Sequence, residues 1–223
     1  SEKFLAIGKL AGGVAHELNT PLGTIVGYAQ LLNEGVSSED KRLQYGQVIY
    51  REAKRCSRII EDLRTFAQRD VCQPGSCEIG SVIREVIETI YNCPGKSHDV
   101  RIESDLAASV LVRGSEGQLD IVLVNLIMNA VHAAAEAGAD PRVTIASRVE
   151  DDSVAISITD NGPGIPQAQR NQLFDPFFTT GSSGLGLGLA ISQSIVTGIG
   201  GNLACDPDFE GGARFVMRLP LAA

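Results

Sequence analysis

The sequence predicts an α+β protein of two domains, in which a helical hairpin precedes an α/β sandwich. In the first part, apolar residues recur every three or four positions up to Phe66, which is the period of amphipathic helices. After the turn-forming segment Gln73–Ser76, strand-like and helical patterns alternate. We therefore expect the hairpin at residues 1–70, a linker at 71–77 and the α/β domain at 78–223.

Two apolar stripes define the hairpin, one from Ile7 to Leu32 and one from Ile49 to Phe66. The first helix should end near residues 33–35, and Ser38 followed by two acidic residues indicates the start of the second. Two antiparallel helices cannot bury both stripes by themselves. We therefore expect a homodimer, in which two hairpins form a four-helix bundle.

The elements of the α/β domain follow from hydrophobic periodicity, and a Gly-rich stretch occupies residues 161–188. The segments Val143–Val149 and Val154–Ile158 alternate as a pair of strands. Helices are expected at 81–91, 115–137 and from the end of the Gly-rich stretch to about 196, and strands at 100–103, 110–112, 143–149, 154–158, 202–205 and 213–219.

Composition and charge exclude some classes of function. The 223 residues carry a net charge of −8, so no broad basic surface is expected to hold nucleic acid. A polyphosphate ligand remains compatible, because backbone N–H groups and a metal ion can hold phosphate. The five cysteines have no C-x-x-C spacing, which argues against a zinc site and favours reduced thiols in the cytoplasm.

The longest apolar stretch, Ile121 to Ala135, is interrupted by three polar residues and is shorter than the about 20 apolar residues of a membrane span. The sequence shows no signal-peptide pattern. We therefore expect no membrane contact by this segment and a cytoplasmic location. Because the sequence begins inside a helical pattern without a cap, we also expect a fragment of a longer protein, such as the cytoplasmic part of an inner-membrane protein.

Helical periodicity places His16 opposite the apolar stripe, with Thr20 one turn further on the same face and Glu17 at the border. Pro21 should bend the helix just beyond them. One interpretation is a surface histidine of a bundle. The other is a nucleophile, because a neutral imidazole nitrogen can attack phosphorus. Glu17 would then orient the ring or accept its proton, and Thr20 would position a water for hydrolysis.

Asn125, Asn129 and His132 share one face of the helix expected at 115–137. Polar groups on an otherwise apolar helix need partners, since an unpaired buried group costs roughly 1–3 kcal/mol. These residues form either a structural hydrogen-bond network or a site for Mg²⁺ and phosphate, because Mg²⁺ prefers oxygen ligands.

Asp160 follows a predicted strand and is followed by Asn161, Gly162, Pro163 and Gly164. Residues of these types form turns in many proteins. The alternative is a base-binding site, in which the carboxylate accepts a hydrogen bond from the exocyclic amine of adenine, where guanine has a carbonyl. The glycines would let the backbone approach the ligand.

Glycines at 184, 186 and 188 precede a helix that continues through Ala190. Glycines at a helix start can present N–H groups to phosphate, with the helix dipole in favour. A Rossmann turn is less compatible, because a strand should come directly before it and an acidic residue about 20 positions after it. The aromatic segment Leu173–Thr180 is either a small core or the hinge of a lid that closes on a ligand.

The run from His16 to Pro21 resembles the H-box of sensor histidine kinases, H-E-x-x-[NT]-P. The downstream segments resemble, in order, the N, G1, F and G2 boxes of the kinase ATP-binding domain, which belongs to the GHKL family together with DNA gyrase. The resemblance covers nearly the whole chain. It implies ATP-dependent autophosphorylation, transfer of the phosphate to an aspartate on a response regulator receiver domain, and a capacity for phosphatase activity.

The resemblance also implies roles for single residues. His16 would be the phosphoacceptor, and Thr20 stands where the family has its phosphatase-assisting residue. Asn129 and Asn125 would serve Mg²⁺ and phosphate, and Asp160 would bind adenine. The other residues expected to bind ATP are His132, Gly162, Gly164, Phe174, Phe178, Thr179, Thr180, Gly184, Leu185, Gly186, Leu187 and Gly188.

The sequence departs from the family pattern at cationic positions. His132 and Gly181 stand where the family often has lysine, and Gln172 where many members have arginine. Lys96 is the one lysine of the α/β domain. We therefore expect phosphate charge to be met by Mg²⁺, backbone amides and Arg170, and ATP binding to be weak and strongly dependent on Mg²⁺.

Two other functions stay open at this point. A phosphotransfer or phosphatase scaffold would bind nucleotide with little kinase activity. A gyrase-like ATPase would release phosphate to water without a phosphorylated histidine. Phosphate labelling of His16 separates both from a kinase.

Overall fold

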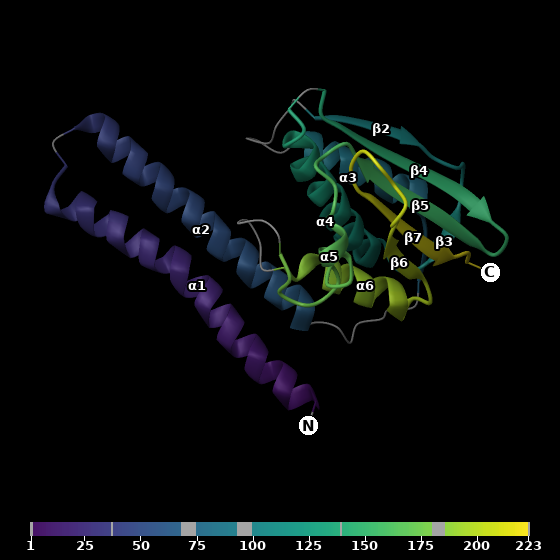
Figure 1. Ribbon diagram of the computed structural model, residues 1–223, viewed down its shortest axis with the longest axis horizontal. Coiled ribbons are helices and arrows are strands. Elements are labelled where there is room, and N and C mark those ends of the chain that lie inside the picture. The colour runs from purple at the N-terminus through teal and green to yellow at the C-terminus, as the bar shows by residue number, and fades with distance from the viewer. Residues whose placement is uncertain are drawn as a thin grey trace. The chain divides into compact units, whose positions relative to one another are not determined.

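The computed structural model describes residues 2–36, 38–67, 75–92, 100–138, 140–179 and 186–222. For residues 2–17, 58 and 61–67 it describes the course of the backbone alone. The chain forms a helical hairpin and an α/β domain, as predicted (Figure 1).

The hairpin consists of α1 (Glu2–Glu34) and α2 (Glu39–Ala67), which lie side by side. Gly35 has a φ of 98°, which suits the turn between them. Tyr28 and Tyr45 pack edge to face across the two helices, with ring centroids 5.1 Å apart. The predicted helix end and helix start are therefore confirmed, and α1 continues through Pro21.

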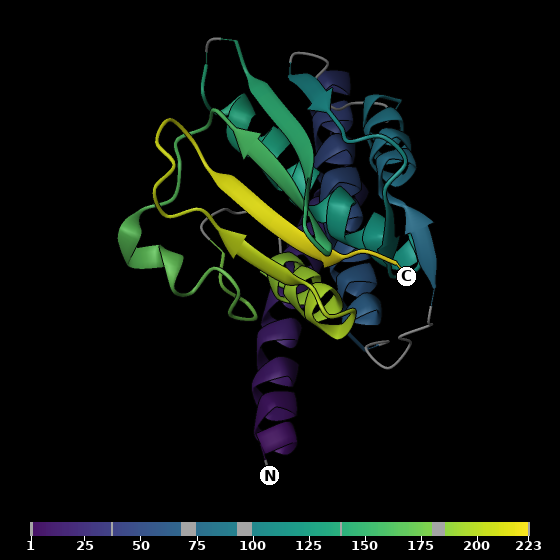
Figure 2. The same cartoon turned by 90° about the vertical axis from the view of Figure 1, so that its right-hand side faces the viewer.

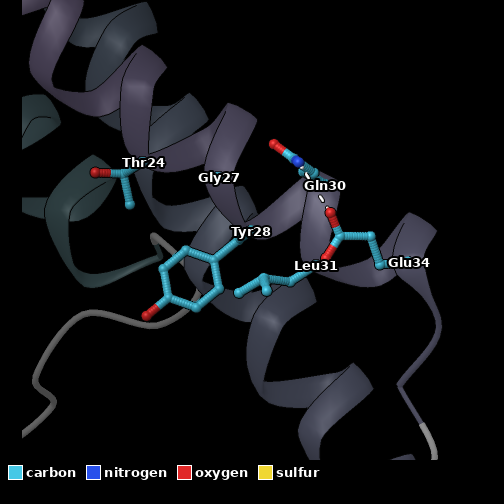
Figure 3. A pocket seen from close by; sticks show the side chains of 6 residues that line it. All are labelled: Thr24, Gly27, Tyr28, Gln30, Leu31 and Glu34. Atoms are coloured by element: carbon cyan, nitrogen blue, oxygen red, sulfur yellow. Dashed lines mark hydrogen bonds between the residues drawn. The ribbon is translucent and has the colours of Figure 1, made fainter.

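The hairpin leaves apolar side chains exposed on both helices: Leu22, Val26 and Leu31 on α1, and Leu43, Tyr50 and Ile60 on α2. A hollow of about 490 Å³ lies along α1. It is lined by Thr24, Gly27, Tyr28, Gln30, Leu31 and Glu34 (Figure 3). At its rim, Gln30 donates a hydrogen bond of 2.9 Å to Glu34. An exposed apolar surface of this kind indicates contact with a further protein surface.

The α/β domain contains a five-stranded sheet in the order β2-β4-β5-β7-β6 and a two-stranded sheet of β1 and β3. In the larger sheet β2 runs parallel to β4, and the other neighbours are antiparallel. The strands are β1 (Ser76–Glu78), β2 (Arg101–Asp105), β3 (Leu111–Arg113), β4 (Arg142–Glu150), β5 (Ser153–Asp160), β6 (Asn202–Cys205) and β7 (Arg214–Pro220).

Three helices cover one face of the larger sheet, namely α3 (Ile79–Tyr91), α4 (Glu116–Ala135) and α6 (Gly188–Gly198) (Figure 2). Every second residue of β5 is buried, which is the pattern of a sheet with one covered face. The core between sheet and helices contains fully buried side chains from both layers, including Leu119, Leu123, Ile127, Ile145, Ile156 and Met217.

α4 is the central helix of this layer. Ser115 and Gln118 form a capping box at its start, which fixes where the helix begins. By length and hydropathy alone α4 would also suit a membrane span, but its apolar side chains pack into the domain core. The predicted helix at 115–137 is thus a core helix with its polar residues on the opposite side.

Three features differ from the predicted elements. β1 overlaps the end of the segment expected as a linker, because Ser76–Glu78 pairs with the distant β3. The short helix α5 (Gln167–Arg170) lies inside the Gly-rich stretch. Asp160 is the last residue of β5, opposite Val143 on β4, and does not follow the strand.

Candidate functional site

The polar face of α4 carries the first part of the site. Asn125 is half-buried, and Asn129 and His132 are exposed. Leu126 and Ala130, adjacent in sequence to these asparagines, are buried in the core. The predicted common face therefore lies outside the core, where a ligand has access to it.

Asn125 connects α4 to the beginning of α6. Its Nδ2 donates a hydrogen bond of 2.9 Å to Oγ of Ser192, a fully buried residue. A Cβ added at Gly188 would lie 2.8 Å from both Cγ and Nδ2 of Asn125. The structure thus brings together Asn125 and Gly188, which sequence analysis assigned to two separate motifs. Ser192 was missed because α6 also contains Gln193, Ser194 and Thr197, so the sequence does not single out one polar residue.

Asp160 carries the second part of the site. Its carboxyl group is buried, with 4% of the residue exposed. Oδ1 accepts hydrogen bonds from the backbone N–H of Gly162 at 2.9 Å and of Ala213 at 3.2 Å. The N–H of Asp160 itself also interacts with the carboxylate. The two donors on Oδ1 therefore fix the orientation of a buried acceptor.

Burial raises the pKa of the Asp160 carboxyl above its ordinary value, although the N–H donors of Gly162 and Ala213 act in the opposite direction. The desolvated carboxyl group gains from any donor that a ligand supplies, because few water molecules compete for it. A buried acceptor at a strand end can accept a hydrogen bond from an N–H group of a ligand.

Glycines pack the loop after β5 against its surroundings. A Cβ at Gly162 would lie 2.5 Å from the carbonyl oxygen of Ala133 on α4. Gly164 has a φ of 75°, and its Cβ would lie 2.9 Å from the carbonyl oxygen of Gly212. Gly212 in turn packs on the backbone of Asp160. The two predicted glycines are therefore needed for close backbone contacts, and Gly212, in the Gly-Gly pair before β7, is a third.

Two arginines contact the loop after β5 and the loop between β6 and β7. Arg170 donates to the carbonyl oxygens of Ile165, at 3.1 Å, and of Pro207. Arg214 lies over the ring of Phe209, with 4.1 Å from its Cζ to the ring centroid. The Arg170 guanidinium is thus bound to backbone carbonyls, and these contacts give no support to the expectation that it meets phosphate charge.

The aromatic segment divides into two parts. Phe174 packs edge to face against Phe215 of β7, with ring centroids 6.4 Å apart, and joins the domain core. Further along, the N–H of Phe177 donates to the carbonyl oxygen of Gly186 at 3.0 Å. Gly186 has a φ of 64°, and an added Cβ would lie 2.6 Å from the carbonyl carbon of Phe177. Residues 177 and 186 therefore close the base of a loop.

The same segment contains further residues predicted to bind ATP, namely Phe178, Thr179, Thr180, Gly184, Leu185 and Leu187. Phe178 is half-buried, Thr179 is exposed and Leu187 is buried. Thr180, Gly184 and Leu185 lie outside the described residues.

The backbone of α1 is helical at His16, Glu17 and Thr20. The side chains of His16 and Glu17 lie outside what the structure describes, and Thr20 is exposed. The carbonyl oxygen of Thr20 accepts a hydrogen bond from Oγ1 of Thr24 at 3.2 Å. The unbroken helix keeps the four-residue spacing on which the predicted common face of His16 and Thr20 depends.

Within the described ranges, no group of three or more His, Cys, Asp or Glu side chains is placed to hold a metal ion. A metal bound here would take its protein ligands from amide oxygens and the remainder from phosphate and water. That donor set fits Mg²⁺, which keeps several waters and binds phosphate oxygens.

Two family models match this chain. Residues 6–71 match the His Kinase A (phospho-acceptor) domain, and residues 114–223 match the histidine kinase-, DNA gyrase B- and HSP90-like ATPase domain. The sensor histidine kinase ZraS of Klebsiella oxytoca is 32% identical over 221 residues, covering 99% of this chain and 47% of the relative. The sensor protein kinase PilS of Pseudomonas aeruginosa is 33% identical over 86% of this chain and 37% of its own length. The chain thus spans less than half the length of these relatives.

Solved structures show the same fold. The histidine kinase ThkA in complex with the response regulator protein TrrA superposes with a TM-score of 0.81, at 24% identity, over 99% of this chain and 64% of that chain. The mycobacterial sensor histidine kinase MprB superposes with a TM-score of 0.59, at 26% identity, over 67% of this chain and 98% of that chain. With the two domain matches in the order that its motifs predict, this chain belongs to the sensor histidine kinase family of two-component systems.

Proposed function

We propose that this chain uses ATP to phosphorylate His16 and then passes the phosphate to an aspartate on a response regulator receiver domain. The observation that carries the proposal is the presence, on one chain, of a phosphoacceptor-domain match that includes His16 and an ATPase-domain match that includes the Asp160 site. We place the hairpin at 1–70 and the α/β domain from β1, at Ser76, to residue 223, so that a linker before Ser76 lets one domain move relative to the other.

Asp160 selects the base. Its Oδ2 accepts a hydrogen bond from the exocyclic amine of adenine, while Gly162 and Ala213 hold Oδ1. Guanine has a carbonyl oxygen at that position, which would face the carboxylate and repel it. Gly162 and Gly164 allow the backbone to line the base and ribose, because neither has a side chain in the way.

The polar face of α4 and the start of α6 receive the phosphates. Asn129 would hold Mg²⁺, which would neutralise charge on the phosphates, while Asn125, one turn earlier, and His132 lie on the same face of α4. The N–H groups at the start of α6, after Gly184, Gly186 and Gly188, point to the phosphate chain. Phe174, Phe178, Thr179 and Thr180 belong to the hinge of the lid, and Leu185 and Leu187 are proposed to bind ATP together with the three glycines.

In the transfer step, a His16 nitrogen attacks the γ-phosphorus. The P–N bond forms while the bond from phosphorus to the bridging oxygen breaks, and ADP leaves. Glu17 orients the imidazole and accepts its proton. The receiver aspartate then attacks phosphorus and the P–N bond breaks. Thr20 positions a water for the opposing phosphatase reaction.

We further propose a cytoplasmic homodimer. The apolar side chains exposed on both helices of the hairpin, among them Leu22, Val26 and Leu43, support a four-helix bundle with a second copy. The net charge of −8 gives no support to a nucleic acid partner. We propose that this segment does not contact a membrane.

Labelling with γ-³²P-ATP tests the proposal. Label on the protein should be stable in alkali and lost in acid, as a phosphoramidate is, and absent from the His16→Gln variant. Absence of label in a dimeric wild-type chain with Mg²⁺ would favour the scaffold. Steady release of phosphate that is unchanged in His16→Gln would favour the ATPase.

A further inference from the structure

We propose that Gly188 and Ser192 form a seat for the side-chain amide of Asn125, so that Asn125 is a positioning residue and Asn129 is the residue of the pair that faces the ligand. The seat, meaning the contacts of Asn125 with Gly188 and Ser192, fixes the first turn of α6 against α4. The inference rests on the proposed function in one respect, namely that a nucleotide binds at this site.

The hydrogen bond to Ser192 forms the first half of the seat. Nδ2 of Asn125 donates to Oγ of Ser192 at 2.9 Å, and Ser192 has no exposed surface. Ser192 lies four residues after Gly188, so the two stand one turn apart on the same face of α6. The amide of Asn125 therefore contacts one face of α6 at two positions that lie one turn apart.

The missing side chain of Gly188 forms the second half. The backbone of Gly188 does not have the left-handed conformation found at Gly186, where φ is 64°. Glycine is therefore required at position 188 because there is no space for a side chain, and not because of the backbone conformation. A Cβ at Gly188 would lie 2.8 Å from Cγ and from Nδ2 of Asn125, closer than such atoms approach in proteins. The space that a side chain would take at 188 is filled by the amide.

Asn129 has a different setting. It stands one turn further along α4, is exposed, and has no comparable contact with α6 among those that the structure describes. The two asparagines therefore have separate tasks. Asn125 sets the spacing between α4 and the N–H groups at the start of α6, and Asn129 reaches the ligand.

Substitution of Gly188 by alanine tests the seat directly. The amide is the end of a flexible side chain, so it can move aside and the domain should fold, but the hydrogen bond to Ser192 is lost. Affinity for Mg²⁺–ATP, measured by calorimetry on the full chain, should fall roughly tenfold or more. Gly117→Ala is the matched control, because Gly117 lies in α4 with open space around its Cα. It should leave the affinity unchanged.

The double variant separates this proposal from a direct role of Gly188 in phosphate binding. In an Asn125→Ala background the amide is gone, so Gly188→Ala should cost little further affinity. Ser192→Ala should weaken binding by a smaller factor than Asn125→Ala. If Gly188→Ala lowers affinity by the same factor in both backgrounds, Gly188 acts through its own backbone on the ligand and the seat is wrong.

Two further readouts keep the seat and the proposed function apart. Hydrogen exchange of the first-turn amides of α6, measured without nucleotide, should be faster in Gly188→Ala and Ser192→Ala than in the wild type. Transfer of phosphate from phosphorylated His16 to a receiver domain should be unchanged. If the wild type binds no nucleotide, the proposed function fails, but exchange still tests the seat. Unchanged exchange in both variants would overturn it.

Discussion

The two ends of the candidate nucleotide site are built differently. At the base end, glycines bring backbone against backbone: a Cβ at Gly162 would lie 2.5 Å from the oxygen of Ala133, and one at Gly212 would lie 2.8 Å from the carbonyl carbon of Asp160. At the phosphate end, the space at Gly188 is filled by the tip of the Asn125 side chain. A backbone segment cannot move without its strand or helix, whereas an amide can rotate away.

This difference fits the roles proposed for the two ends, base binding at one and phosphate binding at the other. A base is rigid and flat, so the acceptor that reads it gains from a fixed position, and Asp160 is fixed by two backbone donors. A phosphate chain is flexible and changes during transfer. A side-chain seat at that end tolerates such change better than backbone packing.

The largest effect should follow from Gly212→Ala. Its φ of 147° is strained for alanine, and the new Cβ would collide with the backbone of Asp160. We expect a loss of about 3 kcal/mol in the stability of the α/β domain and nucleotide affinity below detection. Thermal unfolding and calorimetry measure these quantities.

The neighbouring residue supplies the control. Gly211 also has a positive φ, 91°, but has nothing within 4 Å of an added Cβ. Gly211→Ala should therefore show the conformational cost alone, about 1 kcal/mol. Equal losses in the two variants would mean that the contact with Asp160 has no importance.

The next largest effect should follow from Asp160→Asn, and it should separate affinity from stability. The amide oxygen can keep the bonds from Gly162 and Ala213, but an NH₂ group then faces the amine of adenine. Affinity for ATP should fall by about 2–3 kcal/mol, or roughly 30- to 150-fold. Stability without nucleotide should be unchanged or higher, because a desolvated carboxyl is removed. A parallel loss of stability and affinity would contradict the base-reading role.

A smaller effect should appear in the dependence of stability on pH. Burial raises the pKa of Asp160, so the folded protein holds this proton more tightly than the unfolded chain does. The proton on Asp160 therefore stabilises the folded state. This stabilisation is fully present below the ordinary aspartate pKa and is lost as pH rises through the raised pKa. Without nucleotide, the wild type should thus lose stability relative to Asp160→Asn over that window. Urea unfolding of both chains at a series of pH values measures the difference, and a constant difference would show that Asp160 titrates normally.

Much of this architecture is accessible from the sequence, because periodic elements carry their own signal. The stripe from Ile7 to Leu32 predicted α1, and the apolar positions on either side of Asn125 and Asn129 predicted α4 with its polar face. Asp160 and its glycines were chosen because a carboxylate at the end of a predicted strand, followed by glycines, can accept a hydrogen bond from a ligand that the backbone approaches closely. A site residue is predictable when its own neighbours in sequence carry the signal.

The parts that were missed depend on partners far away in the chain. β1 is three residues long and exists through its pairing with β3. Ser192 and Ala213 act on Asn125 and Asp160 across 67 and 53 positions. Gly188 was predicted to approach phosphate, but a glycine that makes room for a side chain cannot be told from one that approaches phosphate until the fold is known.

The smallest effect should follow from Arg170, and it tests whether this residue belongs to the base end or to the phosphate end. Its contacts with Ile165 and Pro207 fasten the loops around Asp160. Arg170→Met should therefore lower affinity by about 1 kcal/mol, roughly fivefold, and equally for ATP, ADP and AMP. Arg170→Lys keeps the charge but has fewer donors in a fixed geometry, so it should restore only part of the affinity. A loss of affinity that grows with the number of phosphates, with full rescue by lysine, would instead place Arg170 at the phosphate end. Its contacts with Ile165 and Pro207 would then have to break when nucleotide binds, because the same guanidinium would contact phosphate.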